Sequence, residues 1–174
     1  MNSILEKIQH KDATILKVVN TSMSCKTLDF IMPPITYLGS TFFSILFCLV
    51  TLFHSDKNIN SLGVKTLIAL SISSLISRFI KAYVNRVRPF IKHSNLNIKK
   101  IGIDEYSFPS GHTTAAFSIA ITNSLFYPGV AIASILLASC VGISRMYLGV
   151  HYPTDVLAGT FLGSITSVLV FYII

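Results

Sequence analysis

The chain has 174 residues, of which 52% are hydrophobic and only 12% charged, and 14 Lys and Arg against 7 Asp and Glu give a net charge of +7. Because a soluble globular chain carries about 25% charged residues, these values exclude intrinsic disorder, a disulfide-stapled secreted domain and an ordinary water-soluble enzyme. They predict a polytopic helical membrane protein, residues 1–174 forming one domain. The cationic excess favours anionic lipid headgroups or a phosphorylated substrate over nucleic acid.

Residues 1–33 contain isolated apolar residues interrupted by charges, among them Lys7, Lys11, Asp12 and Lys17. This pattern predicts one or two amphipathic helices lying in the membrane interface, with no cleavable signal peptide. A sixth membrane span is the alternative, which the charges disfavour.

Residues 34–174 predict the transmembrane bundle, since a helical span needs about 20 mostly apolar residues. The third and fourth segments come from one long uncharged run that Tyr127-Pro128-Gly129 breaks. Continuous apolar runs favour helices over a β-barrel, so the expected fold class is an all-α polytopic membrane bundle. The five predicted spans are 34–53, 62–80, 112–126, 129–147 and 156–174.

With five spans, residues 1–33, 78–111 and 144–155 share one membrane face, here called the site face. Three polar motifs lie on it. In the first, Lys81 and Arg88 are seven residues apart, which predicts one stripe of a helix that ends at the following proline. Interfacial cations bound to lipid phosphates are the alternative for this motif, and Arg86 is assigned to that role.

The second motif, Pro109-Ser110-Gly111-His112, directly precedes the third span. The first N–H groups of a helix lack intrahelical partners and, with the helix dipole, form an anion site. Gly111 would allow a ligand to approach the backbone closely. Ser110 acting only as a helix cap is the alternative, whereas an ionisable His112 in the first turn of a span favours function.

The third motif contains Arg145, His151, Pro153 and Asp155. Pro153 suits the first turn of the final helix, which places Asp155 where it can reach back to the His151 ring. A carboxylate bonded to one ring nitrogen fixes the tautomer and leaves the other nitrogen free to attack. The alternative, an aspartate that only complements the helix dipole, leaves Arg145 and His151 unexplained.

Together the motifs supply two guanidinium groups, one ammonium, a helix N-terminus and two histidines. This set fits phosphoryl transfer, in which catalysis is largely charge stabilisation and positioning. The residues alone do not decide which histidine is the nucleophile, although Asp155 favours His151. The sequence has no acidic cluster for Mg²⁺, so we expect no metal and no cofactor.

The order and spacing of these motifs, from residue 81 to 155, resemble the complete signature of the type 2 phosphatidic acid phosphatase (PAP2) superfamily. The resemblance implies that His151 forms a phosphohistidine, oriented by Asp155, and that His112 protonates the leaving oxygen and then activates water. It implies a phosphate site made by Lys81, Arg88, Ser110, Gly111 and Arg145. Many bacterial members have six spans, so this chain is expected to lack the first.

From this resemblance we expect metal-independent dephosphorylation of a membrane lipid phosphate, with undecaprenyl pyrophosphate favoured. The alternatives are phosphatidylglycerophosphate, phosphatidate, lipid A 1-phosphate, a soluble phosphoester, or a non-catalytic lipid-binding or transport protein. The expected partners are the lipid substrate and membrane lipids. Gly159 and Gly163 form a GxxxG pattern, which favours either packing within the bundle or a homo-oligomer.

The orientation of the site face in the membrane is predicted differently by two arguments. Twelve Lys and Arg fall on the site face and two, Lys57 and Lys65, on the opposite face. The positive-inside rule therefore predicts a cytoplasmic site. The resemblance implies the extracytoplasmic face of a bacterial inner membrane, and we expect that orientation because substrate-attracting charges distort the count.

Overall fold

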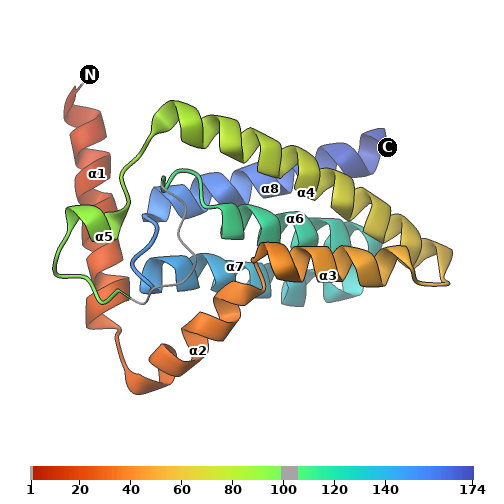
Figure 1. Ribbon diagram of the computed structural model, residues 1–174, viewed down its shortest axis with the longest axis horizontal. Helices are drawn as coiled ribbons and strands as arrows, with labels where there is room; N and C mark the ends of the chain where they lie inside the picture. Colours follow the sequence, from red (N-terminus) through yellow and green to blue (C-terminus); the bar gives the residue numbers. More distant parts are fainter. Residues whose placement is uncertain (1, 99–105) are drawn as a thin grey trace.

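The computed structural model describes residues 2–98 and 106–174, and regular structure in these ranges is entirely helical (Figure 1). The expected all-α membrane bundle is thus confirmed. In chain order the elements are α1 (Asn2–Lys17), the π-helical turn η1 (Val18–Ser22), α2 (Lys26–Tyr37), α3 (Thr41–Leu52), α4 (Lys57–Val84), α5 (Pro89–Lys92), α6 (Gly111–Phe126), the 3₁₀ turn η2 (Pro128–Val130), α7 (Ala131–Tyr147) and α8 (Pro153–Ile173).

Helix α6 occupies the centre of the bundle and packs against α3, α4, α7 and α8. Two glycines of α8 allow this close approach: a Cβ at Gly159 would lie 2.7 Å from the Ser110 carbonyl oxygen, and one at Gly163 would overlap the Thr114 carbonyl oxygen. The GxxxG pattern therefore packs α8 against α6 within one chain. Buried hydroxyls add a bond from α6 to α4, with Ser73 and Ser118 Oγ atoms 3.1 Å apart.

Among the described residues, three helical stretches are long and apolar enough to cross a membrane: 57–92, which joins α4 and α5, 128–147 and 153–173. They correspond to the predicted second, fourth and fifth spans. The third predicted span is α6, which has only 16 residues. The predicted break at 127–129 is confirmed, because α6 ends at Phe126 and η2 follows.

The prediction of one continuous helix over 34–53 is wrong. Helix α2 already begins at Lys26, and a 52° bend separates it from α3, so the pair counts at most as one broken span. Ser40 starts α3 by accepting a hydrogen bond from the Phe43 N–H (3.2 Å). At Gly39 the chain passes so close to α6 that a Cβ would overlap the His112 carbonyl oxygen.

Helix α1 lies across the end of the bundle where α4 ends and α8 begins, here called the site end (Figure 1). Ile4, Leu5 and Ile15 are exposed on α1, whereas Leu16 and Asp12 are buried. A helix is therefore present where the sequence predicts one, and its place in the membrane interface stays a prediction. One of its charged residues, however, points into the protein rather than to the interface.

Candidate active site

The candidate site lies where the C-terminal ends of α4 and α7 meet the N-terminal ends of α6 and α8. The predicted helix extending to Pro89 is wrong: α4 ends at Val84 because Asn85 adopts the left-handed conformation (φ 48°). Asn tolerates this conformation better than most residues. Lys81 and Arg88 therefore reach the site from a helix end and from the following extended segment, not from one helical stripe.

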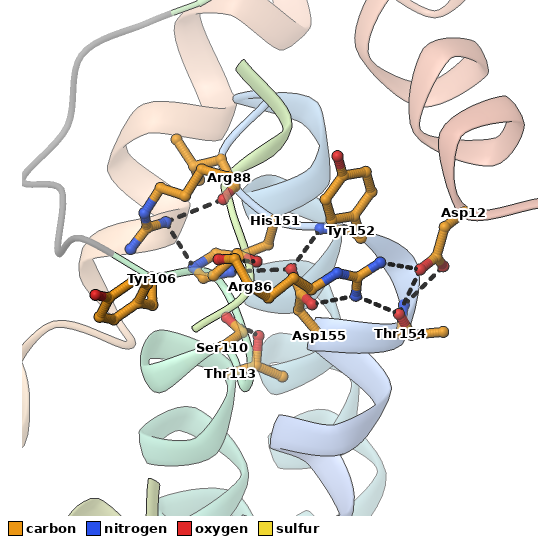
Figure 2. A network of polar contacts seen from close by, with 12 residues as sticks. Asp12, Arg86, Arg88, Tyr106, Ser110, Thr113, His151, Tyr152, Thr154 and Asp155 are labelled. Carbon is orange, nitrogen blue, oxygen red and sulfur yellow. Dashed lines mark hydrogen bonds and ion pairs between the residues drawn. The ribbon is translucent and has the colours of Figure 1, made fainter. Parts of the chain in front are cut away.

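The cations of the first motif are held by backbone carbonyls. The Lys81 ammonium donates to the Tyr106 carbonyl oxygen (2.9 Å). Arg88 is 1% exposed, and its Nη1 donates to the Val150 carbonyl oxygen (3.0 Å) and lies 3.4 Å from His151 Nε2. Two residues 63 positions apart in sequence thus meet through their functional atoms (Figure 2).

Ser110 begins α6 but its hydroxyl makes no capping bond to the helix backbone, so the interpretation as a simple cap is wrong. The hydroxyl instead accepts a hydrogen bond from Thr113 Oγ1 (2.9 Å), and the Ser110 N–H donates to the Asp155 carbonyl oxygen (3.0 Å). Apart from its chain neighbours and the backbone of α6 itself, no described atom lies within 4 Å of the position that a Cβ of Gly111 would occupy. Open space therefore faces the backbone at the start of α6.

The third motif places His151 and Asp155 side by side. Pro153 starts α8 as predicted, and Asp155 in its first turn accepts a hydrogen bond from the Tyr152 N–H (2.8 Å). The same carboxylate oxygen, Oδ2, lies 3.6 Å from His151 Nδ1, which has no hydrogen-bond partner among the described residues. Arg145 lies in the last turn of α7, is 1% exposed and donates a hydrogen bond to Thr36 Oγ1 of α2 (2.9 Å).

The neighbours of the His151 ring determine its tautomer. A guanidinium only donates hydrogen bonds, so the contact with Arg88 requires an unprotonated Nε2. The ring proton then sits on Nδ1, facing Asp155. This arrangement leaves the Nε2 lone pair directed toward the cations, although the Nδ1–Oδ2 distance is longer than a normal hydrogen bond.

Burial holds the pKa of His151 well below its usual range, and the positive charges of Arg145, Arg88, Lys81 and His112 lower this pKa further. The ring is consequently neutral near pH 7. Of these four groups Arg88 contacts the ring directly (3.4 Å from its Nη1 to His151 Nε2), and the other three lie close enough to lower the pKa of the ring.

Lys81, Arg88, His112 and Arg145, like His151 itself, lie in the part of the chain that matches a known protein family. The sequence model of the PAP2 superfamily matches residues 62–174. The chain belongs to the PAP2 superfamily. It is 37% identical over 106 residues to the "bacitracin transport permease protein BcrC" of Bacillus licheniformis, a match covering 60% of this chain and 52% of that protein.

A second relative, an undecaprenyl-diphosphatase of Sulfolobus acidocaldarius, is 33% identical over 114 residues, covering 65% of this chain and 55% of the relative. The chain thus spans about half the length of these two relatives. The crystal structure of a transmembrane PAP2-type phosphatidylglycerolphosphate phosphatase from Bacillus subtilis superposes with a TM-score of 0.77 at 28% identity, covering 96% of this chain and 86% of that one. The protein is thus a multi-pass membrane protein of this superfamily.

The structure places two further residues at the site, Arg86 and Asp12, which are not part of the PAP2 signature. Arg86 donates from Nη1 to Asp155 Oδ1 (2.5 Å) and from Nη2 to Asp12 Oδ2 (2.6 Å), as Figure 2 shows. Its assignment to lipid phosphates is therefore wrong. Asp12 lies outside the residues that the family model matches and 74 positions from Arg86, so no local pattern in the sequence reveals the pair.

A cleft of about 520 Å³ between α3, α4 and α6 reaches the site, and Lys81, Gly111 and His112 contribute to its lining. Arg78, one helical turn before Lys81 on α4, lines the same cleft. The other histidines of the chain lie elsewhere: His10 and His54 are exposed, and His93 packs edge-on against Tyr152.

Proposed function

We propose that the protein removes phosphate from a membrane lipid phosphate or pyrophosphate without a metal ion, through a phosphohistidine at His151. The observation that carries this proposal is the buried neutral imidazole whose Nε2 lone pair faces Arg88, with Lys81 and Arg145 close by. A protein that only grips a phosphate needs these cations but has little use for an oriented, neutral ring.

In the first step, Nε2 of His151 attacks the phosphorus atom and the bond from phosphorus to the leaving oxygen breaks. His112 gives a proton to that oxygen. The phosphate oxygens take over the Arg88 guanidinium, which releases Nε2, and also bind Lys81, Arg145 and the start of α6. Because these donors stand in place beforehand, they stabilise the developing charge without reorganisation.

In the second step, water attacks the phosphorus atom of the phosphohistidine while His112 takes a proton from it. The N–P bond breaks, inorganic phosphate leaves and His151 returns to its neutral form. Asp155, opposite Nδ1, balances the positive charge that the ring carries while Nε2 is phosphorylated.

The cleft between α3, α4 and α6 supports a lipid substrate. It lies among membrane helices and leads to Lys81 and His112, so the lipid tail would remain among the helices while its phosphate enters the site. The similarity to an undecaprenyl-diphosphatase supports undecaprenyl pyrophosphate as the favoured substrate.

Arg78 favours a pyrophosphate over a monophosphate. It lines the cleft together with His112, on the side where the leaving group departs. The leaving group of a pyrophosphate is a charged lipid phosphate, which an arginine would stabilise, whereas that of a monophosphate is a neutral alcohol. The structural relative named as a phosphatidylglycerolphosphate phosphatase supports phosphatidylglycerophosphate as the second candidate. Phosphatidate, lipid A 1-phosphate and non-catalytic transport remain further alternatives.

The activity is tested by purifying the protein in detergent with EDTA, adding a polyprenyl pyrophosphate and measuring released phosphate for wild type and His151→Ala. We expect release by wild type alone. A transporter would release none in either sample, and undiminished release by the variant would contradict the proposal.

The substrate class is tested with Arg78→Gln, comparing a polyprenyl pyrophosphate and monophosphate of equal chain length. We expect kcat/KM for the pyrophosphate to fall about tenfold, since a hydrogen bond to a charged group contributes about 1.5–3 kcal/mol, with little change for the monophosphate. Lys65→Gln, near the other end of α4, is the control. Equal losses for both substrates would contradict selection of pyrophosphate by Arg78.

We also propose that the site faces the outside of a bacterial inner membrane. Ser94 is exposed on the segment after α5, so Ser94→Cys in a chain whose native cysteines are replaced should react with an impermeant thiol reagent on intact cells. Reaction only after the cells are opened would place the site in the cytoplasm.

A further inference from the structure

Arg86 is held between two buried carboxylates that come from opposite ends of the chain. Asp155, on α8, is 0% exposed, and Asp12, on α1, is 2% exposed. The two guanidinium nitrogens divide between them, with Nη1 on Asp155 Oδ1 and Nη2 on Asp12 Oδ2. The Tyr152 ring stacks on the guanidinium, with 4.1 Å between Cζ and the ring centroid. Arg86 is thereby fixed from three directions (Figure 2).

Asp12 also binds the first turn of α8 directly. Its Oδ1 accepts a hydrogen bond from the Thr154 N–H (3.1 Å), one of the N–H groups that lack an intrahelical partner. The Thr154 hydroxyl lies 2.5 Å from Asp12 Oδ2 and 2.7 Å from Arg86 Nη1. Asp12 therefore contacts both the guanidinium that holds Asp155 and the residue that precedes Asp155 in the chain.

These contacts determine the direction in which Asp155 points. Oδ1 is bound to Arg86 and Oδ2 to the Tyr152 N–H, so the carboxylate cannot rotate without breaking one of the two hydrogen bonds. In this orientation Oδ2 faces His151 Nδ1 at 3.6 Å. Without Asp12, Arg86 loses the partner that keeps it extended across the carboxylate, and the first turn of α8 loses an anchor.

We propose that Asp12 is a positioning residue for the reaction: acting through Arg86 and Thr154, it keeps Asp155 aimed at His151. This inference rests on the proposed function. Burying two carboxylates around one guanidinium carries a desolvation cost that hydrophobic packing would avoid, so fold stability alone gives no reason for the arrangement. Helix α1 thereby becomes part of the catalytic architecture.

The test compares kcat and KM of wild type, Asp12→Asn and Asp12→Glu in detergent with a polyprenyl pyrophosphate. The amide nitrogen that Asp12→Asn introduces would face hydrogen-bond donors on Arg86 and Thr154, which would displace Asp155 from His151. Because small displacements of reacting groups lower reaction rates strongly, we expect kcat to fall about tenfold or more. KM should change less than twofold. Asp12→Glu keeps the carboxylate and should recover most of kcat.

A double-mutant cycle separates positioning from general damage. In an Asp155→Asn background, Asp12→Asn should lower kcat less than twofold further, because its target is already removed. Arg86→Lys keeps the charge but lacks the forked guanidinium that reaches both carboxylates. Its effect on kcat should also be lost in the Asp155→Asn background, so this variant replaces Asp12→Asn in the cycle if Asp12→Asn folds poorly. Asp56→Ala, which removes a helix cap at the other end of the bundle, controls for lowered thermal stability.

The possible results are distinct. If wild type is active and His151→Ala inactive while Asp12→Asn keeps wild-type kcat, the positioning role is overturned and the proposed function stands. If Asp12→Asn also lowers kcat tenfold in the Asp155→Asn background, the positioning role is again overturned. If wild type and His151→Ala both fail to release phosphate, the proposed function fails and the inference falls with it.

Discussion

The two ends of the helix bundle use charged residues in different ways. At the site end Asp12, Arg88, Arg145, His151 and Asp155 are all at most 2% exposed, and they interact across helices distant in sequence. At the other end, here called the far end, His54 and Asp56 are exposed. Asp56 accepts hydrogen bonds from the N–H groups of Asn58 (2.8 Å) and Ile59 (3.1 Å), only two and three residues away.

The comparison shows what each set of charges does. At the far end a charge ends a loop and begins a helix, a local task in contact with water. At the site end the charges are buried at a desolvation cost and converge on one imidazole. The same residue types thus serve structure at one end and, in our proposal, chemistry at the other.

The sharpest test of this contrast replaces one histidine at each end. His151→Ala should lower kcat/KM by about a thousandfold or more, because losing the nucleophile of a covalent mechanism removes the reaction path itself. His54→Ala at the far end should stay within about twofold of wild type. Comparable activity of the two variants would break the distinction between the ends.

A second pair compares aspartates. Asp155→Asn should lower kcat about a hundredfold or more with KM changed less than threefold, since an amide can stabilise the wrong ring tautomer, as in serine proteases. Asp56→Asn should leave both constants unchanged, because Asn caps helices as well as Asp. If the main change for Asp155→Asn were in KM, the residue would serve binding rather than orientation of His151.

The pH dependence gives a smaller effect. Burial and nearby cations lower the pKa of His151, so the ring loses its proton at a lower pH than an ordinary histidine, whose pKa is about 6.5. The acid limb of kcat/KM assigned to His151 should therefore lie below about pH 6.5, and activity should persist as pH falls through that value. The ionisation of the substrate, followed by phosphorus NMR in the same micelles, is the control; an acid limb at or above the ordinary histidine value after this correction contradicts the assignment.

The smallest effect is expected from Asp56→Ala. Loss of this cap should cost about 1 kcal/mol of stability, seen as a lower Tm in detergent, while kcat stays within about twofold. A large loss of kcat here would mean that stability alone controls activity, and that the buried charges of the site end need no catalytic explanation.

The parts of the site that sequence reasoning could predict depend on local spacing. His151 and Asp155 are four residues apart across a helix start that Pro153 marks, and the structure places them side by side. Arg88 does reach the His151 ring, and Lys81 lies close enough to lower the pKa of that ring, but the predicted helix between the two cations was wrong because Asn85 ends α4. The convergence of the motifs was predictable, whereas the backbone path between them was not.

Other features depend on contacts between distant residues. The bend before α3 reflects the close approach of Gly39 to α6, which a run of apolar residues does not reveal. Arg86 and Asp12 pair across 74 positions. From the sequence alone, every acidic residue of the chain was an equally good candidate for the partner of this arginine. Only the fold, which lays α1 across the site end, selects Asp12.

The proposed reaction is tested most stringently by isolating its covalent intermediate on His112→Ala. The leaving group of a pyrophosphate needs little protonation, so attack by His151 should still occur, whereas hydrolysis should slow without the base that activates water. Rapid quenching with labelled polyprenyl pyrophosphate, followed by peptide mass analysis, should find an acid-labile phosphate on His151 that His151→Ala lacks. Turnover by wild type with no protein-bound phosphate, or with phosphate on another residue, would contradict the phosphohistidine mechanism.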